Sequence, residues 1–251
     1  MKGKAYAREA SWLLKEKYHG RLTESAKADL ARLGRGEPVD YLIGFVEFAG
    51  CVIDLSFKPL IPRPETEYWV MEAMRELKKD RRRELYCLDM FSGSGCIGMA
   101  VLKHVPFSRV DFAEKEEKLI SQIRLNLKKN GLSGKRSRPF RTDIFSNIPG
   151  KYDCIFANPP YVAESRKRTV QASVLKHEPK AALFAGKDGL RYIKRFLKEA
   201  KEHLYPGGKI YMEFDSPQQR EIDRLLEKYG YGTRVFRKDQ YGRWRWCAAA
   251  I

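Results

Sequence analysis

Apolar side chains recur at helical spacing near the start of the chain, and the pattern then becomes strand-like. Residues 4–18 and 23–33 repeat apolar positions at intervals of three and four, which predicts a pair of helices. Residues 44–56 alternate around a glycine, which predicts a β-hairpin. A proline-rich segment follows, and after it we predict a helix whose buried side chains are Val70, Met74 and Leu77.

Short apolar runs and amphipathic helical stretches alternate through the rest of the chain. Predicted strands occupy residues 86–91, 109–114, 139–142, 152–158 and 209–214. Helices are expected between them, the last one burying Leu190, Ile193, Leu197 and Leu204. This alternation predicts an α/β fold with a doubly wound, mainly parallel sheet. Two final strands, at 233–239 and 243–251, are joined by a link too short for a helical crossover, so at least one should run antiparallel.

We therefore divide the chain into three parts. These are a short helical N-terminal region (1–36), a hairpin and linker (37–64) and a main α/β domain (65–251). With 251 residues, of which 43% are hydrophobic, the chain has the composition of a folded protein. It shows no apolar run long enough to span a bilayer and no secretion signal, which predicts no membrane association and a cytoplasmic location.

Cysteine and histidine spacing adds no further chemistry. The five cysteines are scattered and mostly lie in apolar runs, and the four histidines have no metal-ligand spacing. We therefore predict neither a disulfide framework nor a metal site.

The chain has a formal net charge of +17, which indicates attraction to polyanions or to an acidic protein. Basic runs lie at 78–83, 135–138 and 166–168. The other basic residues are spread along the chain, so a lysine-rich solvated surface explains the charge equally well. The charge alone does not decide whether nucleic acid is a partner.

A glycine-rich turn directly follows the predicted strand 86–91. Gly93, Gly95 and Gly98 fit the pattern G-x-G-x-x-G, and Glu114 ends the next strand. Glycines allow a tight turn and close approach of a ligand, the helix N-terminus attracts an anion, and the carboxylate suits ribose hydroxyls. Such a turn binds either a dinucleotide or S-adenosylmethionine. The alternative interpretation is that the glycines only let a helix pack against a strand.

The predicted strand 152–158 ends abruptly in Asn158, Pro159, Pro160 and Tyr161. The prolines stiffen the chain, so two acceptors, the Asn158 side-chain oxygen and the Pro159 carbonyl, are held beside an aromatic face. They match the two N–H bonds of a planar amide or amino group. An amide nitrogen is a poor nucleophile because its lone pair is delocalised, and acceptors that hold both hydrogens can orient it toward a sulfonium methyl group. The alternative, an ordinary turn, is disfavoured by the glycine turn one strand away.

With these motifs in place, residues from about 36 to the C-terminus resemble the peptide chain release factor glutamine methyltransferases. The most specific stretches are LIPRPETE and HEPKAALFAGKDGL, and LYPGGKIYMEFDSPQQ is also similar. The resemblance implies a seven-stranded, Rossmann-like, S-adenosylmethionine-dependent methyltransferase fold after a small helical region and hairpin. It further implies methylation of the side-chain amide nitrogen (N5) of glutamine in the Gly-Gly-Gln motif of release factors. We expect a monomer with a release factor as its protein partner.

The resemblance also implies roles for particular residues. Asn158, Pro159, Pro160 and Tyr161 would form the catalytic glutamine pocket, with Asn158 also touching the cofactor. Arg63 and Glu65 would lie near the cofactor mouth, although a helix-start role for Pro64 and Glu65 fits equally well. Residues 177–179 would border the site. The remaining cofactor-binding residues would be Phe91, Ser92, Gly93, Ser94 and Gly95 at the methionine end, Glu114 at the ribose, and Asp143 and Ile144 beside the adenine.

The sequence departs from the family pattern in three places. Phe91 stands where a glycine is usual, so we expect a backbone without positive φ and an altered methionine pocket. Glu114 replaces the usual aspartate but keeps the acceptor. The helical region of about 36 residues is shorter than is typical, which affects how a release factor would be recognised.

Other functions remain open from the sequence. A methyltransferase acting on the exocyclic amine of a nucleic-acid base (N6-adenine type) would use the same strand-end acceptors, with residues 166–168 on phosphates. A catalytically inactive binding module on the same fold is a second alternative, because of Phe91. A nicotinamide dehydrogenase fits least, because nothing after strand 152–158 suits hydride transfer.

Overall fold

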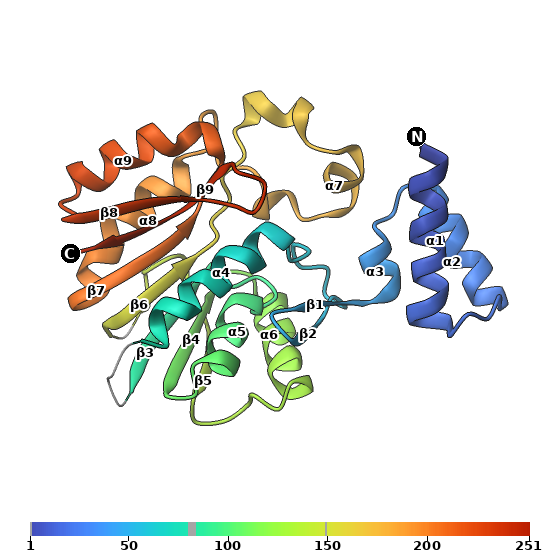
Figure 1. The fold of residues 1–251 in the computed structure, drawn as a ribbon, viewed down its shortest axis with the longest axis horizontal. Coiled ribbons are helices and arrows are strands. Elements are labelled where there is room, and N and C mark those ends of the chain that lie inside the picture. Colours follow the sequence, from blue (N-terminus) through green and yellow to red (C-terminus); the bar gives the residue numbers. More distant parts are fainter. Residues whose placement is uncertain (1, 80–83, 149) are drawn as a thin grey trace.

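A computed structural model of the chain describes residues 2–79, 84–148 and 150–251 and contains a seven-stranded sheet (Figure 1). The strand order is β5-β4-β3-β6-β7-β9-β8. Neighbours from β5 to β7 pair in parallel, and β9 is antiparallel to both β7 and β8, which confirms the predicted mainly parallel sheet. The strands are β3 (Leu85–Met90), β4 (Ser108–Glu114), β5 (Ser137–Arg141), β6 (Tyr152–Ala157), β7 (Leu204–Glu213), β8 (Thr233–Lys238) and β9 (Trp244–Ala250).

Helices cover the two faces of this sheet and form two apolar cores. One core joins the sheet to α4 (Pro64–Leu77), α5 (Cys96–His104) and α6 (Glu117–Lys129). The other joins it to α8 (Arg191–Ala200) and α9 (Gln219–Lys228). The doubly wound architecture is therefore confirmed, and the parallel strands end together at one edge of the sheet.

One predicted helix was too long. Its apolar spacing ran on to Leu204, but α8 ends at Ala200 and a single turn of 3-10 helix follows. Leu204 instead begins β7 and pairs with Tyr152 of β6. Helical spacing alone did not reveal this end, because Leu204 is fully buried in the sheet as it would be on a helix.

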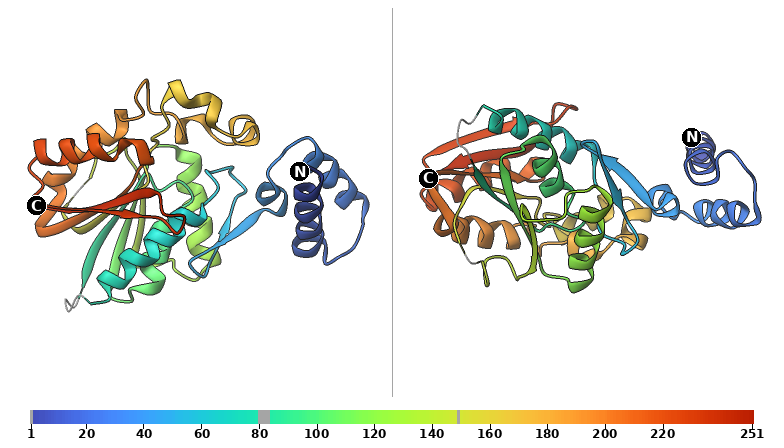
Figure 2. Two further views of the ribbon diagram at one scale, coloured as in Figure 1. Left: turned by 45° about the horizontal axis from the view of Figure 1, so that its top comes forward. Right: turned by 90° about the horizontal axis from the view of Figure 1, so that it is seen from below.

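The N-terminal helices form a small core of their own. In Figures 1 and 2, α1 (Lys2–Tyr18) and α2 (Glu24–Gly34) lie at one end of the molecule, away from the sheet. The predicted helix pair is thus confirmed, with α3 (Val39–Ile43) added. A buried Asp29 accepts hydrogen bonds from Lys17, Tyr18 and Arg32. The apolar residues of this core are Leu13, Leu33, Val39, Leu42 and Ile43.

The predicted hairpin is also present, as antiparallel β1 (Phe45–Phe48) and β2 (Cys51–Asp54). Side-chain amides of α6 and of its C-cap residue bind the outer edge of this hairpin. Asn126 Oδ1 accepts from the Asp54 N–H at 2.8 Å, and Asn130 exchanges two hydrogen bonds with the backbone of Val52 at 2.9 and 2.7 Å. These contacts satisfy an edge that would otherwise be unpaired, and they fix the following linker near the ends of the parallel strands.

A long connection joins β6 to α8 and contains short helical turns. Val162 forms an isolated bridge to Phe184 within it.

All five cysteines are buried. No helix in the described part of the chain has the length and apolar character needed to cross a membrane. Of the basic run 78–83, residues 80–83 lie outside the described part. The β6–α8 connection contains η1 (Glu164–Thr169), α7 (Ala172–His177) and η2 (Lys180–Ala182), whereas η3 (Lys201–His203) follows α8 and η4 (Ser216–Gln218) follows β7.

Candidate active site

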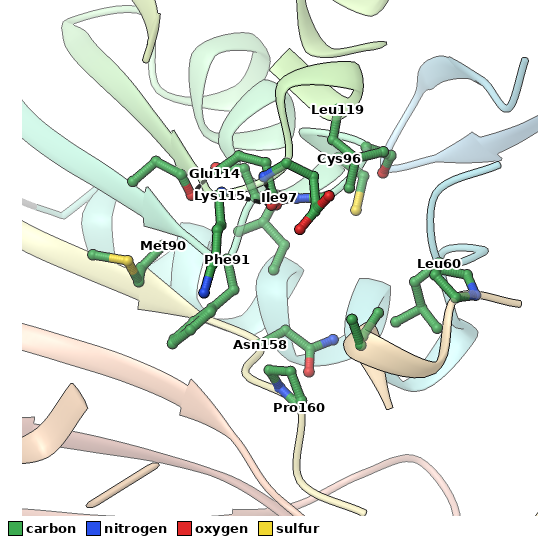
Figure 3. Close-up of a pocket in the computed structure, with 18 of the residues that line it drawn as sticks. Leu60, Met90, Phe91, Cys96, Ile97, Glu114, Lys115, Leu119, Asn158 and Pro160 are labelled. Carbon is green, nitrogen blue, oxygen red and sulfur yellow. Dashed lines mark hydrogen bonds between the residues drawn. The ribbon is translucent and has the colours of Figure 1, made fainter. Parts of the chain in front are cut away.

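A cavity of about 360 Å³ opens where the parallel strands end (Figure 3). It lies between β3 and β6, where the strand order reverses, which is where open α/β sheets bind ligands. Its volume falls in the range of about 300–1,000 Å³ for small-molecule sites. The predicted site residues that line it are Phe91, Ser92, Gly93, Ser94, Glu114, Asp143, Ile144, Asn158 and Pro160. Three other predicted site residues, Gly95, Pro159 and Tyr161, are not among the described residues that line it.

The glycine turn between β3 and α5 uses its glycines in two ways. Gly93 and Gly95 have φ of +56° and +81°, the left-handed region that favours glycine. Gly98 has a packing role instead, because a Cβ there would lie 2.4 Å from the ring of Phe112 on β4. The motif therefore needs glycine for two reasons: Gly93 and Gly95 form the tight turn, and Gly98 lets α5 pack closely against β4.

Phe91 overturns one expectation, because its φ is +60° rather than negative. The chain reverses directly after β3, and the Phe91 ring packs near Tyr192 and Phe196 with centroids 6.3 and 6.2 Å away. These contacts offset a strain on the order of 1–2 kcal/mol. The turn thus keeps the backbone that a glycine would give, while two aromatic rings, Phe91 and Tyr192, line the cavity.

Glu114, at the end of β4, holds the glycine turn in place. Its Oε2 accepts from the Gly93 N–H at 2.8 Å, and its Oε1 accepts from Lys115 and Glu116 N–H groups at 2.7 and 3.0 Å. Burial raises the pKa of this carboxyl, and the three hydrogen bonds oppose that shift. A carboxylate offers about four acceptor sites, so Glu114 can still accept a hydroxyl donor from the cavity.

The end of β5 adds Asp143 and Ile144 to the wall. Asp143 accepts from Lys115 and Arg195 at 3.1 and 3.2 Å. Ile144 is buried with φ of +54°, and its carbonyl accepts from the Thr142 hydroxyl at 2.9 Å. The loop therefore has a fixed shape beside the glycine turn.

The strand-end corner after β6 faces the same cavity. Asn158 is half-buried, and its Nδ2 donates to Thr66 Oγ1 at 3.4 Å. No described residue donates to its Oδ1, and Figure 3 shows the side chain beside Pro160, across the cavity from Ile97 in the first turn of α5. Pro159 and Pro160 are buried, which keeps the corner rigid. Asn158 Oδ1 is thus an acceptor available to a bound ligand.

Glu213 closes the apolar run of β7, and the sequence patterns did not predict it as a site residue. Its Oε2 accepts from Thr66 Oγ1 and Trp69 Nε1, both at 2.7 Å, and its Oε1 accepts from the Tyr161 hydroxyl at 2.9 Å. Burial raises its pKa, while these donors and the charge of Arg245 lower it. An acidic residue at the end of a buried strand is the signal that could have identified it.

Gly189 and Gln218 support the corner from behind and were also missed. Gln218 Nε2 donates to the Tyr161 carbonyl at 2.9 Å. A Cβ on Gly189 would lie 2.3 Å from that same carbonyl, and its φ is +73°. Only glycine leaves room for the corner at this position.

The predicted bordering loop meets the proline-rich linker at the cavity mouth. Arg63 pairs with Glu178 at 2.5 Å, and Glu178 also accepts from the Ile61 N–H at 3.2 Å. Arg63 and Pro179 line the cavity. Pro64 and Glu65 instead begin α4 and are absent from the described lining, which favours their helix-start role.

Comparison with known proteins agrees with this architecture. The family model described as methyltransferase small domain matches residues 72–186. The release factor glutamine methyltransferase of Bacteroides thetaiotaomicron is 36% identical, covering 84% of this chain and 75% of its own length. That of Streptococcus pneumoniae is 35% identical, with 84% and 74% covered.

Solved methyltransferase structures share the fold. A methyltransferase from Pyrococcus furiosus has a TM-score of 0.57 at 22% identity, with 89% of this chain and 97% of that chain covered. A T. thermophilus 16S rRNA methyltransferase, solved in complex with AdoMet and guanosine, has a TM-score of 0.59 at 18% identity, with 82% and 49% covered. The predicted Rossmann-like methyltransferase fold is therefore confirmed. Given the identity to its curated relatives, this chain is a methyltransferase that belongs to the release factor glutamine methyltransferase family.

Proposed function

We propose that this chain transfers a methyl group from S-adenosylmethionine to the side-chain amide nitrogen of glutamine in the Gly-Gly-Gln motif of release factors. The names of its curated relatives support this substrate. The observation that best supports the chemistry is the placement of Asn158. Its Oδ1 is open to the cavity that the glycine turn also lines.

The donor half of the cavity fits S-adenosylmethionine. The left-handed turn at Gly93 and Gly95 and the N-terminus of α5 would receive the methionine carboxylate. Glu114 would accept from a ribose hydroxyl, and Asp143 and Ile144 would lie beside the adenine. When bound there, this cofactor supplies an electrophilic methyl group on a positively charged sulfur.

The acceptor half would prepare the amide for attack. Asn158 Oδ1 and the Pro159 carbonyl would each accept one hydrogen of the glutamine –NH2 group, which fixes the nitrogen and directs its lone pair at the methyl carbon. Transfer would form the N–C bond and break the C–S bond, which would leave a neutral thioether on the donor. The methylated amide is then strongly acidic and releases its extra proton to water.

The two alternatives are less well supported. The 16S rRNA methyltransferase among the solved structures, at 18% identity, is too distant to indicate more than a fold. An inactive module was suggested by Phe91, but its positive φ preserves the turn that a donor needs.

We further propose how the parts of the chain divide the work. Residues 65–251 would form the catalytic domain, and the helical region 1–36 with the linker 37–64 would contact the release factor at the cavity mouth. The chain would act as a monomer in the cytoplasm, where its substrate works.

The test is mass spectrometry of a purified release factor incubated with this chain and S-adenosylmethionine. We expect one added methyl group on the Gly-Gly-Gln glutamine, and none on a release factor whose motif glutamine is replaced by alanine. Methyl transfer into RNA or DNA with none into the release factor would overturn the proposal.

A further inference from the structure

Thr66 occupies a position between two polar partners, and it can donate to only one of them. It lies in the first turn of α4, is 2% exposed, and its Oγ1 is 2.7 Å from Glu213 Oε2 and 3.4 Å from Asn158 Nδ2. A hydroxyl has a single hydrogen and two acceptor sites. The direction of that one hydrogen therefore decides how Asn158 is bound.

Glu213 determines where the Thr66 hydroxyl hydrogen points. Three donors surround its carboxylate, from Thr66, Trp69 and Tyr161. An ionised carboxylate has no hydrogen to donate, so Thr66 must point its own hydrogen at Glu213. Burial raises the pKa of this carboxyl, and the three hydrogen bonds and the charge of Arg245 oppose that shift; the three donors that converge on its two oxygens match the ionised form. Thr66 Oγ1 is then left with acceptor sites only on the side of Asn158.

The direction of the Thr66 hydrogen determines which atom of the Asn158 amide faces the cavity. Because Thr66 can only accept, the Asn158 –NH2 group turns toward it and Oδ1 turns toward the ligand. The flipped amide would place two acceptors against each other and an –NH2 group in the cavity. Such a cavity would repel the –NH2 group of a glutamine and favour a carboxylate.

We propose that Thr66 and Glu213 are positioning residues that fix the orientation of the Asn158 amide, and that this polarity makes the site select glutamine over glutamate. The inference rests on the proposed function, because it takes glutamine as the residue bound beside Asn158. It explains why a buried acid lies at the end of β7, behind the corner and 147 residues from Thr66 in the sequence.

The test compares binding of two synthetic release-factor peptides that differ only in Gly-Gly-Gln versus Gly-Gly-Glu. Calorimetry is done with S-adenosylhomocysteine present, on the full chain and on the isosteric variant Thr66→Val. We expect the unchanged chain to prefer the glutamine peptide by at least about tenfold, the equivalent of one hydrogen bond. Thr66→Val should bring the two affinities to within about threefold, because the Asn158 amide can then flip.

Two matched variants separate polarity from general damage. Thr66→Ser keeps the hydroxyl and should keep the preference. Trp69→Phe removes another donor from Glu213 Oε2 without touching Asn158, and it too should keep the preference. A purely structural role for Thr66 would weaken both peptides equally and leave their ratio unchanged.

The outcomes are distinct for the two proposals. An undiminished glutamine preference in folded Thr66→Val, verified by its thermal transition, overturns the positioning role while the proposed function stands. An unchanged chain that does not prefer glutamine overturns both.

Discussion

The two halves of the cavity are built by different means. The donor half is assembled from the ends of neighbouring parallel strands, and Glu114 holds it through three backbone N–H groups. The acceptor half is a short rigid corner, and side chains from α4, β7 and η4 hold it through Glu213 and Gln218. The donor half therefore depends on backbone conformation, whereas the acceptor half depends on which side chains donate and which accept.

Removing the Asn158 side-chain acceptor should have the largest effect on catalysis, and that effect should be confined to the acceptor half of the cavity. We expect Asn158→Ala to lower kcat by about 10²–10³-fold, as loss of one preorganised polar group does in other active sites. The affinity for the methyl donor, measured by calorimetry, should change little because the glycine turn is untouched. A rate near that of the unchanged chain would remove the proposed role of Asn158.

A glycine pair tests how tightly the corner is supported. Gly189→Ala would force a Cβ to 2.3 Å from the Tyr161 carbonyl, so we expect a loss of about 3 kcal/mol or more in the free energy of unfolding. Gly186→Ala is the matched control, since its φ is +80° but its nearest neighbour is 3.8 Å away. It should lose only about 1 kcal/mol. Equal losses in urea unfolding would show that the corner tolerates displacement.

The buried carboxyl of Asp89, in the donor half, should make the stability of the chain depend on pH. It lies at the end of β3, where burial raises its pKa to about 7, and its Oδ2 accepts from the Gly98 N–H at 2.9 Å. The folded chain thus binds this proton more tightly than the unfolded chain does. The resulting stabilisation is complete below pH 4 and is lost as the pH rises through about 7.

Asp89→Asn removes this titration. Relative to the variant, the unchanged chain should lose up to about 4 kcal/mol of unfolding free energy between pH 4 and 8. Denaturant unfolding at several pH values measures the difference. Parallel profiles for the two proteins would contradict the raised pKa.

The smallest effect is expected at the contact between α6 and the glycine turn. Asn126 Nδ2 donates to the Ser94 carbonyl of the glycine turn at 2.9 Å. Asn130 lies four residues later and binds the Val52 carbonyl, outside the glycine turn. Asn126→Ala should weaken methyl-donor binding several-fold and cost about 1–2 kcal/mol of stability. Asn130→Ala should leave donor binding unchanged. Equal donor affinities in the two variants would show that the glycine turn does not need this contact.

The donor half was largely predictable because its signals are local. The glycine spacing, the acidic residue at the next strand end and the alternation of strands and helices all lie within short stretches of sequence. Phe91 was predicted wrongly for a physical reason. Its intrinsic preference is for negative φ, but tertiary packing of its ring outweighs that preference in the folded chain.

The support of the acceptor half could not be predicted in this way. Asn158 and its prolines form a local signal, but Thr66 and Glu213 meet only because β7 lies beside β6 and α4 packs across the sheet. Such contacts depend on topology, and a single sequence does not give the distance between residues so far apart. Leu204 illustrates the same limit, since burial in a strand and burial on a helix look alike in the pattern.

The most direct test is a crystal structure of this chain with S-adenosylhomocysteine and a Gly-Gly-Gln peptide. We predict that the glutamine –NH2 nitrogen lies about 3 Å from Asn158 Oδ1. The account would be contradicted by a glutamine side chain bound away from the strand-end corner, or by one whose carbonyl oxygen faces Asn158 Nδ2.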